Sequence, residues 1–327
     1  MNVLLTGGAG YIGSHVALKL IEEGHEVSIV DNLTTGSENL IPKQASFLKC
    51  NINNKEKISN LLKNNKFDAI MHFAAFIQVE ESVKNPNKYF KNNKDNTINF
   101  FETCYENKLT NLIFSSTAAV YGNNKTNKPI SEKMDLNPLN PYGKSKLDVE
   151  NYLLKNSDRF NYIILRYFNV AGADPELRSG LISKKSSHLI KIASEVAIGK
   201  RKKITIYGND YKTFDGTAVR DYIHVSDLAD IHINILNFLK KNKVSNIFNC
   251  GYGKGYSVKE VIDAANNITN GSIKYEYGKR RLGDSEILIS DVSKLNNLIN
   301  WEPKYNNLNV ILKTSIDWEK KINEKNF

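Results

Sequence analysis

A tyrosine and a lysine stand four residues apart at Tyr142 and Lys146, directly after Pro141. Residues at i and i+4 lie on one face of an α-helix, and a proline suits the first helical turn. A tyrosine has a pKa near ~10, so acid–base work at neutral pH needs a shift of about three units, or ~4 kcal/mol. A cation about 4 Å away, at an effective dielectric constant near 20, supplies about that much. The pair could therefore act as a proton switch, although the same spacing is also common in purely structural helices.

A glycine-rich turn lies between an apolar run at residues 3–6 and a helical pattern at residues 12–22. The turn, from Thr6 to Gly13, satisfies both G-x-G-x-x-G and G-x-x-G-x-x-G. Glycines permit the tight turn and let backbone N–H groups approach a pyrophosphate at a helix N-terminus. Asp31 follows Gly13 by 18 residues, where a carboxylate binds a ribose 2′-hydroxyl and repels a 2′-phosphate. The pattern predicts NAD, and not NADP, as the cofactor.

Short apolar runs alternate with helical patterns through the first half of the chain. The runs lie at residues 27–31, 47–48, 69–73, 112–116 and 162–167, and further helical patterns lie at 55–63 and 89–107. Continuous apolar strands separated by helices indicate a parallel sheet covered on both faces. We therefore expect an α/β fold with a Rossmann-type doubly wound parallel sheet and a second, smaller α/β substrate domain. The expected NAD-binding domain spans residues 1–170, with segments around 217–251 returning to it, and the smaller domain spans residues 171–327.

The composition is that of a globular protein, with 327 residues of which 41% are hydrophobic and 24% charged. The net charge of +10 is scattered and residues 200–203 form the one dense basic run, so we expect surface lysines and no nucleic-acid partner. Three cysteines are too few for a disulfide framework, and the six histidines show no ligand spacing, so we predict no metal. No run approaches ~18 apolar residues and no charged leader precedes residue 3, so we expect a soluble, cytoplasmic protein without a membrane partner.

The glycine turn and Tyr142-x-x-x-Lys146 together resemble the extended short-chain dehydrogenase/reductase family. In that family the tyrosine is the acid/base at a sugar hydroxyl, and the lysine binds the nicotinamide ribose and lowers the tyrosine pKa. An upstream Ser or Thr completes the catalytic triad, and Thr117 matches its position; its hydroxyl can hydrogen-bond the reacting oxygen in either charge state. Nucleotide-sugar dehydratases of the family carry carboxylates where Ala118 and Ala119 stand. The resemblance therefore implies oxidation and reduction at C4 without elimination.

Within this family the chain is most similar to the 4-epimerases of UDP-hexoses, from the first strand to about Trp301. Residues 166–169, 215–225 and 280–284 carry the likeness beyond the glycine turn and the tyrosine motif. It implies reversible C4 epimerisation of UDP-glucose and UDP-galactose through a 4-keto sugar with tightly bound NAD. Two alternatives stay open: a 4-epimerase of UDP-N-acetylhexosamines or UDP-uronates, and a non-catalytic NAD-sensing regulatory protein. The likeness also implies a homodimer through helices near residues 89–107 and 142–154.

The same resemblance assigns residues to each part of the site. Two arginines would hold the UDP phosphates, a tyrosine would lie beside the uracil and an aspartate would bind ribose, as paired cations suit a dianionic diphosphate. The implied cofactor residues are Gly7, Gly10, Tyr11, Ile12, Gly13, Asp31, Asn32, Thr35, Gly36, Asn51, Ile52, Phe73, Ala74, Asn92, Tyr142, Lys146 and Phe168. The implied substrate residues are Thr117, Asn169, His188, Leu189, Tyr207 (uracil), Arg220 and Arg281 (phosphates) and Asp284 (ribose).

Four positions depart from the family pattern. Asn51 stands where an adenine-binding aspartate is usual, and Ile77 replaces a lysine that some epimerases place near the cofactor phosphates. His188 stands where asparagine is frequent, and Leu288 falls where bulk is thought to exclude N-acetylated sugars. These positions leave open how firmly NAD is retained and which UDP-sugars are accepted.

Overall fold

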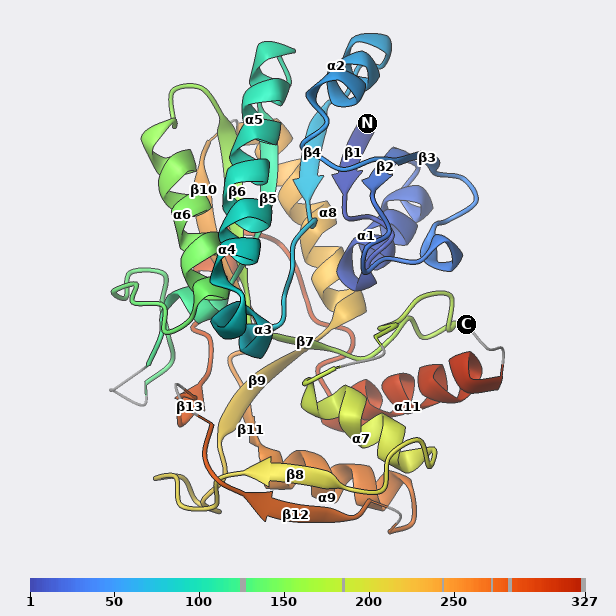
Figure 1. The fold of residues 1–327 in the computed structure, drawn as a ribbon, viewed down its shortest axis with the longest axis vertical. Helices are drawn as coiled ribbons and strands as arrows, with labels where there is room; N and C mark the ends of the chain where they lie inside the picture. Colours follow the sequence, from blue (N-terminus) through green and yellow to red (C-terminus); the bar gives the residue numbers. More distant parts are fainter. Residues whose placement is uncertain (124–127, 184–185, 243, 272, 282–283, 325–327) are drawn as a thin grey trace.

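A seven-stranded parallel sheet forms the centre of the molecule in the computed structural model (Figure 1), which describes residues 1–123, 128–183, 186–242, 244–271, 273–281 and 284–324. Its strand order is β10-β6-β5-β4-β1-β2-β3, the doubly wound order of a Rossmann fold extended by one strand. The strands are β1 (Asn2–Thr6), β2 (Glu26–Asp31), β3 (Ser46–Lys49), β4 (Ala69–His72), β5 (Asn111–Thr117), β6 (Asn161–Tyr167) and β10 (Asn246–Cys250).

Helices cover both faces of this sheet because successive side chains of a strand point to opposite sides. In β1, Val3 and Leu5 pack into the core beneath one set of helices, while Leu4 packs beneath the other. The first set contains α1 (Tyr11–Glu22) and α8 (Val225–Asn242), and the second contains α2 (Lys55–Asn64), α5 (Asn96–Glu106) and α6 (Pro141–Lys155). The predicted α/β fold is confirmed.

A smaller region with its own core lies beside the carboxyl ends of the large sheet (Figure 1). After β9 the chain returns to the large sheet through α8 and β10, while β9 itself pairs only within the smaller region. Its sheets contain β7 (Asn169–Ala171), β9 (Val219–His224), β11 (Gly255–Ser257) and β13 (Ile287–Leu288), and the pair β8 (Ile204–Tyr207) and β12 (Tyr275–Gly278). Its helices α7 (Leu189–Ala197), α9 (Val258–Ile268) and α11 (Leu308–Glu324) pack together, whereas α10 (Ser293–Leu298) packs against β10.

The helix expected at residues 89–107 is interrupted by a π-helical turn. The chain forms α4 (Pro86–Tyr89), a π-helix (Phe90–Asp95) and then α5. From the π-helix, Asn93 Nδ2 donates to the Phe76 carbonyl at 2.8 Å, and Asn93 Oδ1 accepts from the Phe76 N–H at 2.9 Å. The wide turn therefore fixes the segment that follows β4, in agreement with the frequent use of such turns at functional sites.

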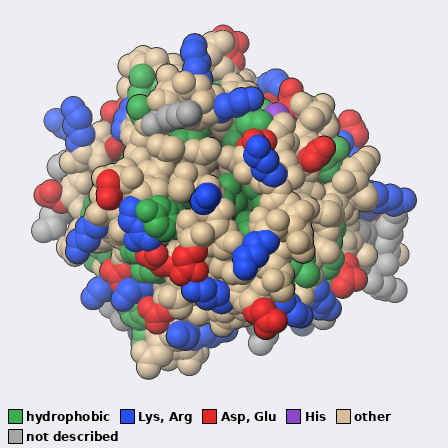
Figure 2. All heavy atoms as spheres, turned by 90° about the horizontal axis from the view of Figure 1, so that it is seen from above, with side chains coloured by type: hydrophobic (Ala, Val, Ile, Leu, Met, Phe, Trp, Pro, Cys, Tyr) green, Lys and Arg blue, Asp and Glu red, His purple; other side chains and the backbone are tan. Residues whose placement is uncertain are grey.

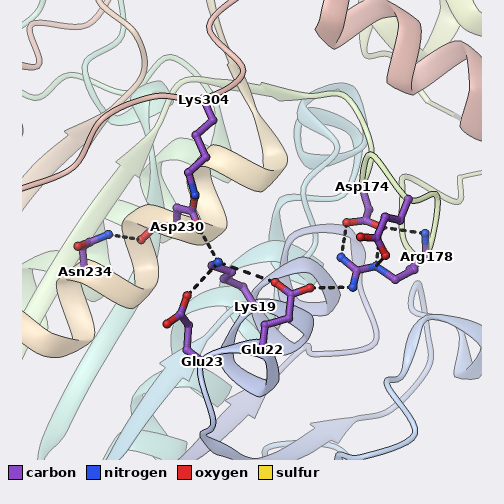
Figure 3. A network of polar contacts seen from close by, with 9 residues as sticks. Lys19, Glu22, Glu23, Asp174, Arg178, Asp230, Asn234 and Lys304 are labelled. Atoms are coloured by element: carbon purple, nitrogen blue, oxygen red, sulfur yellow. Dashed lines mark hydrogen bonds and ion pairs between the residues drawn. The ribbon is translucent and has the colours of Figure 1, made fainter.

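Ion pairs join α1 to the elements around it (Figure 3). Lys19 Nζ lies 3.3 Å from the carboxylate of Asp230 on α8, which Lys304 Nζ also approaches at 3.0 Å. At the end of α1, Glu22 accepts from Arg178 at 2.7 Å. Ion pairs near the surface contribute only about 0–1 kcal/mol each, so these contacts add little to the stability of the helix that follows the glycine turn.

Carboxylates lie beside three of the four cations in the dense basic run at residues 200–203. Lys200 Nζ lies 3.6 Å from Glu319, and Lys203 pairs with Glu276. On the face drawn in Figure 2, Lys and Arg side chains are interspersed with Asp and Glu. A polyanion would therefore have to displace carboxylates from most of this basic run.

Candidate active site

Two cavities of about 430 Å³ each adjoin at the carboxyl ends of β1, β4, β5 and β6. Ligands of open α/β sheets bind at this edge, and cavities of this volume suit small-molecule ligands. Tyr142, Ser116 and Tyr167 line both cavities. Groups bound in the two cavities would therefore meet at the Tyr142 hydroxyl.

The glycine turn forms the floor of the first cavity. Gly7 has a φ of +74°, and a Cβ atom there would lie 2.6 Å from the Ala74 nitrogen. A Cβ on Gly13 would lie 2.4 Å from the Gly7 carbonyl oxygen. Helix α1 starts at this turn with no acidic residue in its first turn, so its free N–H groups and positive end face an anion. The turn fits the pyrophosphate of NAD.

Most residues implied for the cofactor line the first cavity. These are Gly7, Gly10, Tyr11, Ile12, Gly13, Asp31, Asn32, Thr35, Asn51, Ile52, Phe73, Ala74, Asn92, Tyr142 and Lys146. Gly36 does not, because it packs behind the turn, where a Cβ would lie 2.9 Å from the Ala9 carbonyl oxygen. Phe168 lines the second cavity instead.

The sequence reasoning missed several residues that line the first cavity. Ser115 and Ser116 directly precede Thr117, and Tyr167 directly precedes Phe168. Their positions next to predicted site residues could have indicated that they line the cavity. Lys88 also lines this cavity from α4, with its ammonium 2.6 Å from Glu81 Oε1. No pattern near Lys88 in the sequence indicates that it reaches the cavity.

Asp31 ends β2 with its carboxylate held by backbone donors. Its Oδ2 accepts from the Ala9 N–H at 3.1 Å and its Oδ1 from the Leu33 N–H at 2.8 Å. Burial raises the pKa of Asp31, and these hydrogen bonds oppose part of that rise. Leu33 has a φ of +60°, an uncommon conformation of the kind that concentrates at ligand sites. The turn thus holds the Asp31 carboxylate at the wall of the first cavity.

Replacing Asp31 by serine is expected to weaken NAD binding about 10-fold to 100-fold, because a hydrogen bond to a charged group contributes about 1.5–3 kcal/mol. The affinity for NADP relative to NAD should rise, because the carboxylate that repels a 2′-phosphate is gone. Titration of cofactor-free protein with each dinucleotide measures both effects. Asp317→Ser on the exposed side of α11 is the control, and an unchanged NADP/NAD ratio in Asp31→Ser would contradict the assignment.

Local sequence brings Thr117 and Tyr142 together. The Asn140 side chain caps α6 by accepting from the Gly143 N–H at 2.9 Å. A Cβ on Gly143 would lie 2.7 Å from the Ala119 carbonyl oxygen, so glycine lets the first turn of α6 approach the turn after Thr117. The Thr117 side chain then hydrogen-bonds Tyr142 and lowers its pKa.

Burial changes the proton affinities of the expected pair. Lys146 Nζ donates to the Ser115 carbonyl at 2.7 Å, and burial lowers the Lys146 pKa to about 7, opposed by the charge of Glu150. Burial also raises the pKa of Tyr142, by more than the hydrogen bond from Thr117 lowers it. Burial therefore sets the direction of the Tyr142 pKa shift, and the lowering by Lys146 that the family resemblance implies stays a prediction.

The second cavity gathers the residues implied for the substrate. Arg220 donates to Asp284 Oδ1 at 2.5 Å, and the Arg281 guanidinium lies 3.9 Å above the ring of Tyr207. Arg281 Nε lies 3.7 Å from Glu80 Oε1, on α3 (Val79–Lys84), and has no hydrogen-bond partner among the described residues. Two cations therefore face one cavity, as a diphosphate site requires. The lining includes Thr117, Asn169, His188, Leu189, Tyr207, Arg220, Arg281 and Asp284.

The turn after Thr117 carries no acid or base. Ala118 and Ala119 line the second cavity, and Asp284, which pairs with Arg220, supplies the carboxylate among its described lining residues. The hydroxyls of Tyr142 and Thr117 lie beside this turn and can transfer protons there. This favours oxidation and reduction without elimination.

The family model described as "NAD dependent epimerase/dehydratase family" matches residues 3–251. The chain belongs to this family. That match covers the glycine turn, the Thr117–Tyr142–Lys146 group and Arg220. It leaves out Arg281 and Asp284, which the smaller region contributes to the second cavity.

Members of the epimerase/dehydratase family resemble this chain over nearly its whole length. A UDP-glucose 4-epimerase of Lactobacillus helveticus is 41% identical over 98% of this chain and 97% of that protein. The structure of the UDP-Glc/GlcNAc 4-epimerase of Campylobacter jejuni is 46% identical with a TM-score of 0.86, covering 98% of this chain and 99% of the other. The UDP-glucose 4-epimerase of Bifidobacterium longum in complex with NAD+ and UDP is 33% identical with a TM-score of 0.94, covering all of both chains (100%).

Proposed function

We propose that this protein catalyses the reversible C4 epimerisation of UDP-glucose and UDP-galactose, with NAD retained between turnovers. The observation that carries the proposal is the position of Tyr142 at the junction of a cavity that fits NAD and a cavity with two arginines. Two of the relatives described above, from Lactobacillus helveticus and Bifidobacterium longum, are named UDP-glucose 4-epimerases, which supports the proposal.

The protein's own groups have separate parts in this reaction. The residues of the first cavity would hold NAD, which would supply a reversible acceptor for the hydride of the sugar C4 carbon. As the phenolate, which the positive charge of Lys146 would favour, the Tyr142 oxygen takes the proton of the 4-hydroxyl and later returns it, while Thr117 hydrogen-bonds the same sugar oxygen. Arg220 and Arg281 hold the diphosphate, so binding energy falls on UDP and the 4-keto hexose stays free to turn its other face.

Purified protein supplied with UDP-galactose and no added NAD is expected to form UDP-glucose, and the reverse reaction should reach the same mixture. Separation of the sugar nucleotides by chromatography checks the products, and UDP-N-acetylgalactosamine is tested beside them. Conversion that requires added NAD would show that the cofactor exchanges. An absence of conversion of every UDP-hexose, with NAD added, would overturn the proposal and favour an NAD-sensing regulatory protein.

One observation favours a second candidate, the 4-epimerisation of UDP-N-acetylhexosamines. Leu288 lines the second cavity and packs beside Phe168, and it is smaller than an aromatic side chain at the same place. The similar Campylobacter jejuni enzyme is named for both UDP-Glc and UDP-GlcNAc. A kcat/KM for the N-acetylated substrate comparable to that for UDP-galactose would support dual activity.

We also propose that the protein is a homodimer of the cytoplasm. Tyr105 on α5 and Leu154 on α6 are 40% and 44% exposed, which supports an interface on these helices. Cys50, Cys104 and Cys250 are buried free thiols, which suits a reducing compartment. Among the described residues, no helix has the length and apolar character needed to cross a membrane. Light scattering during gel filtration tests the dimer, and a monomeric mass would contradict it.

A further inference from the structure

Helix α6 carries a third buried polar group behind the tyrosine and lysine of the active site. Tyr142, Lys146 and Glu150 follow one another at intervals of four residues, so they lie along one face of the helix. Lys146 is 2% exposed and Glu150 is fully buried. No step of the reaction described above uses Glu150.

Glu150 and Arg166 form a buried ion pair between α6 and β6. Arg166 donates to the carboxylate through Nε at 3.1 Å and through NH2 at 2.6 Å, and the two side chains are 2% and 0% exposed. The opposite edge of Arg166 donates to the Tyr121 hydroxyl at 2.9 Å. Burying two charges costs several kcal/mol per ion, and apolar replacement of such a pair is often neutral or stabilising. Fold stability alone therefore does not require this pair.

The carboxylate also reaches the strand that carries the catalytic groups. Ser116 Oγ donates to Glu150, and Ser116 lines both cavities. The residue before it, Ser115, holds Lys146 through its carbonyl, and the residue after it is Thr117. The hydrogen bond from Ser116 to Glu150 thus fixes the β5 backbone between Ser115, which contacts Lys146, and Thr117, which contacts Tyr142.

We propose that Glu150 is a positioning residue with two effects: its bond to Ser116 fixes the β5 backbone at the active site, and its charge keeps Lys146 cationic. The proposal deepens the epimerase function stated above and rests on it. Arg166 holds the Glu150 carboxylate in place and compensates its charge within the core.

The charged and titratable groups around Lys146 agree with this role. His72 faces it from β4 and is neutral, since burial and the lysine charge both lower its pKa. Tyr142 faces it from α6, Phe114 packs its ring 4.8 Å from the ammonium, and Arg166 on β6 is paired with Glu150. Burial lowers the Lys146 pKa, and Glu150 opposes this change. Without that charge Lys146 would lose its proton at a lower pH.

Glu150→Gln removes the carboxylate charge, whereas Glu150→Asp keeps the charge but changes the position of the carboxylate. In the holoenzyme, Glu150→Gln is expected to lower kcat about 10-fold to 100-fold and to move the alkaline side of the pH–activity curve down by about one unit. Glu150→Asp should keep the alkaline side in place because the charge remains. Ser116→Ala should lower kcat about 10-fold at every pH, with KM and the shape of the curve unchanged.

The matched control is Glu102 on α5, a helix that packs against α6. Glu102 pairs with Arg159, so Glu102→Gln removes a Glu–Arg pair away from the cavities and should leave kcat and the pH curve at wild-type values. If Glu150→Gln leaves an unpaired Arg166 that prevents folding, the double variant Glu150→Gln, Arg166→Gln removes both charges. That variant should move the alkaline side in the same direction but by less, because the loss of the Arg166 charge offsets part of the loss of the carboxylate.

The proposal would be overturned if the alkaline side of the pH–activity curve did not move in either charge-removing variant. Equal shifts of that curve in Glu150→Gln and Glu150→Asp would also overturn it. Wild-type kcat in Ser116→Ala would remove the backbone-positioning effect. Wild-type protein assayed in parallel distinguishes the two failures. If it does not epimerise UDP-hexoses, the proposed function fails; if it does and the variants match it, only the role of Glu150 fails.

Discussion

Tyr142→Phe is expected to lower epimerase turnover by about 10³-fold or more while NAD stays bound. The Tyr142 oxygen lies where the two cavities meet and is hydrogen-bonded by Thr117, so removal of this oxygen removes the proton acceptor for the sugar 4-hydroxyl. General acid–base groups contribute typically about 10²–10⁴-fold. The phenylalanine ring keeps the shape of the cavity wall, so the loss should appear in kcat with little change in KM.

Tyr152→Phe provides the matched control, because Tyr152 lies on the same helix with its hydroxyl bonded to Glu102 outside the cavities. Steady-state kinetics with UDP-galactose measures turnover, and release of dinucleotide on denaturation measures the NAD content of each protein. Turnover of Tyr142→Phe within about 10-fold of wild type would contradict its role as the acid/base. Loss of NAD from this variant would show that the tyrosine acts mainly in cofactor binding.

Local patterns predicted the parts of the site that depend on local structure. The glycine turn follows from the steric needs of residues 7–13, and the start of α6 follows from the Asn140 cap and Pro141. Parallel strands end at one edge of a sheet, so the glycine turn and Thr117 had to meet there. The fold class could therefore be predicted from the sequence, whereas the division of residues between cofactor and substrate came from the family resemblance.

Other features depend on packing between distant segments. The π-helix, the inward reach of Lys88 and the position of Gly36 behind the turn arise from contacts that no short sequence window contains. Proton affinities are the clearest case. The spacing of Tyr142 and Lys146 indicates their charges but not their desolvation, which shifts both pKa values against the simple expectation. Burial is a property of the folded chain, so sequence spacing could not give its sign or size.

Lys146→Met is expected to abolish turnover and to make the protein more stable at about pH 6. Burial lowers the pKa of Lys146 to about 7 in the folded state, against about 10.4 in an unfolded chain. Between these values the unfolded state binds more protons, so the free energy of unfolding of the wild type rises with pH. Below about pH 7 the folded protein carries the full cost of the buried ammonium, on the order of 4 kcal/mol for a shift of about three units.

Methionine fills a similar volume without a charge, so urea denaturation of cofactor-free protein should show about 2–4 kcal/mol more stability at about pH 6 and a shallower pH dependence. Lys191→Met is the contrasting control, because Lys191 is buried in an ion pair with Glu319 and its loss leaves that carboxylate less compensated. That variant should be less stable than wild type. A Lys146→Met variant that is destabilised at about pH 6, or that retains turnover, would contradict this account. If Lys146→Met gains stability and loses turnover, as expected, the fold keeps a costly buried cation because the proton switch at Tyr142 requires it.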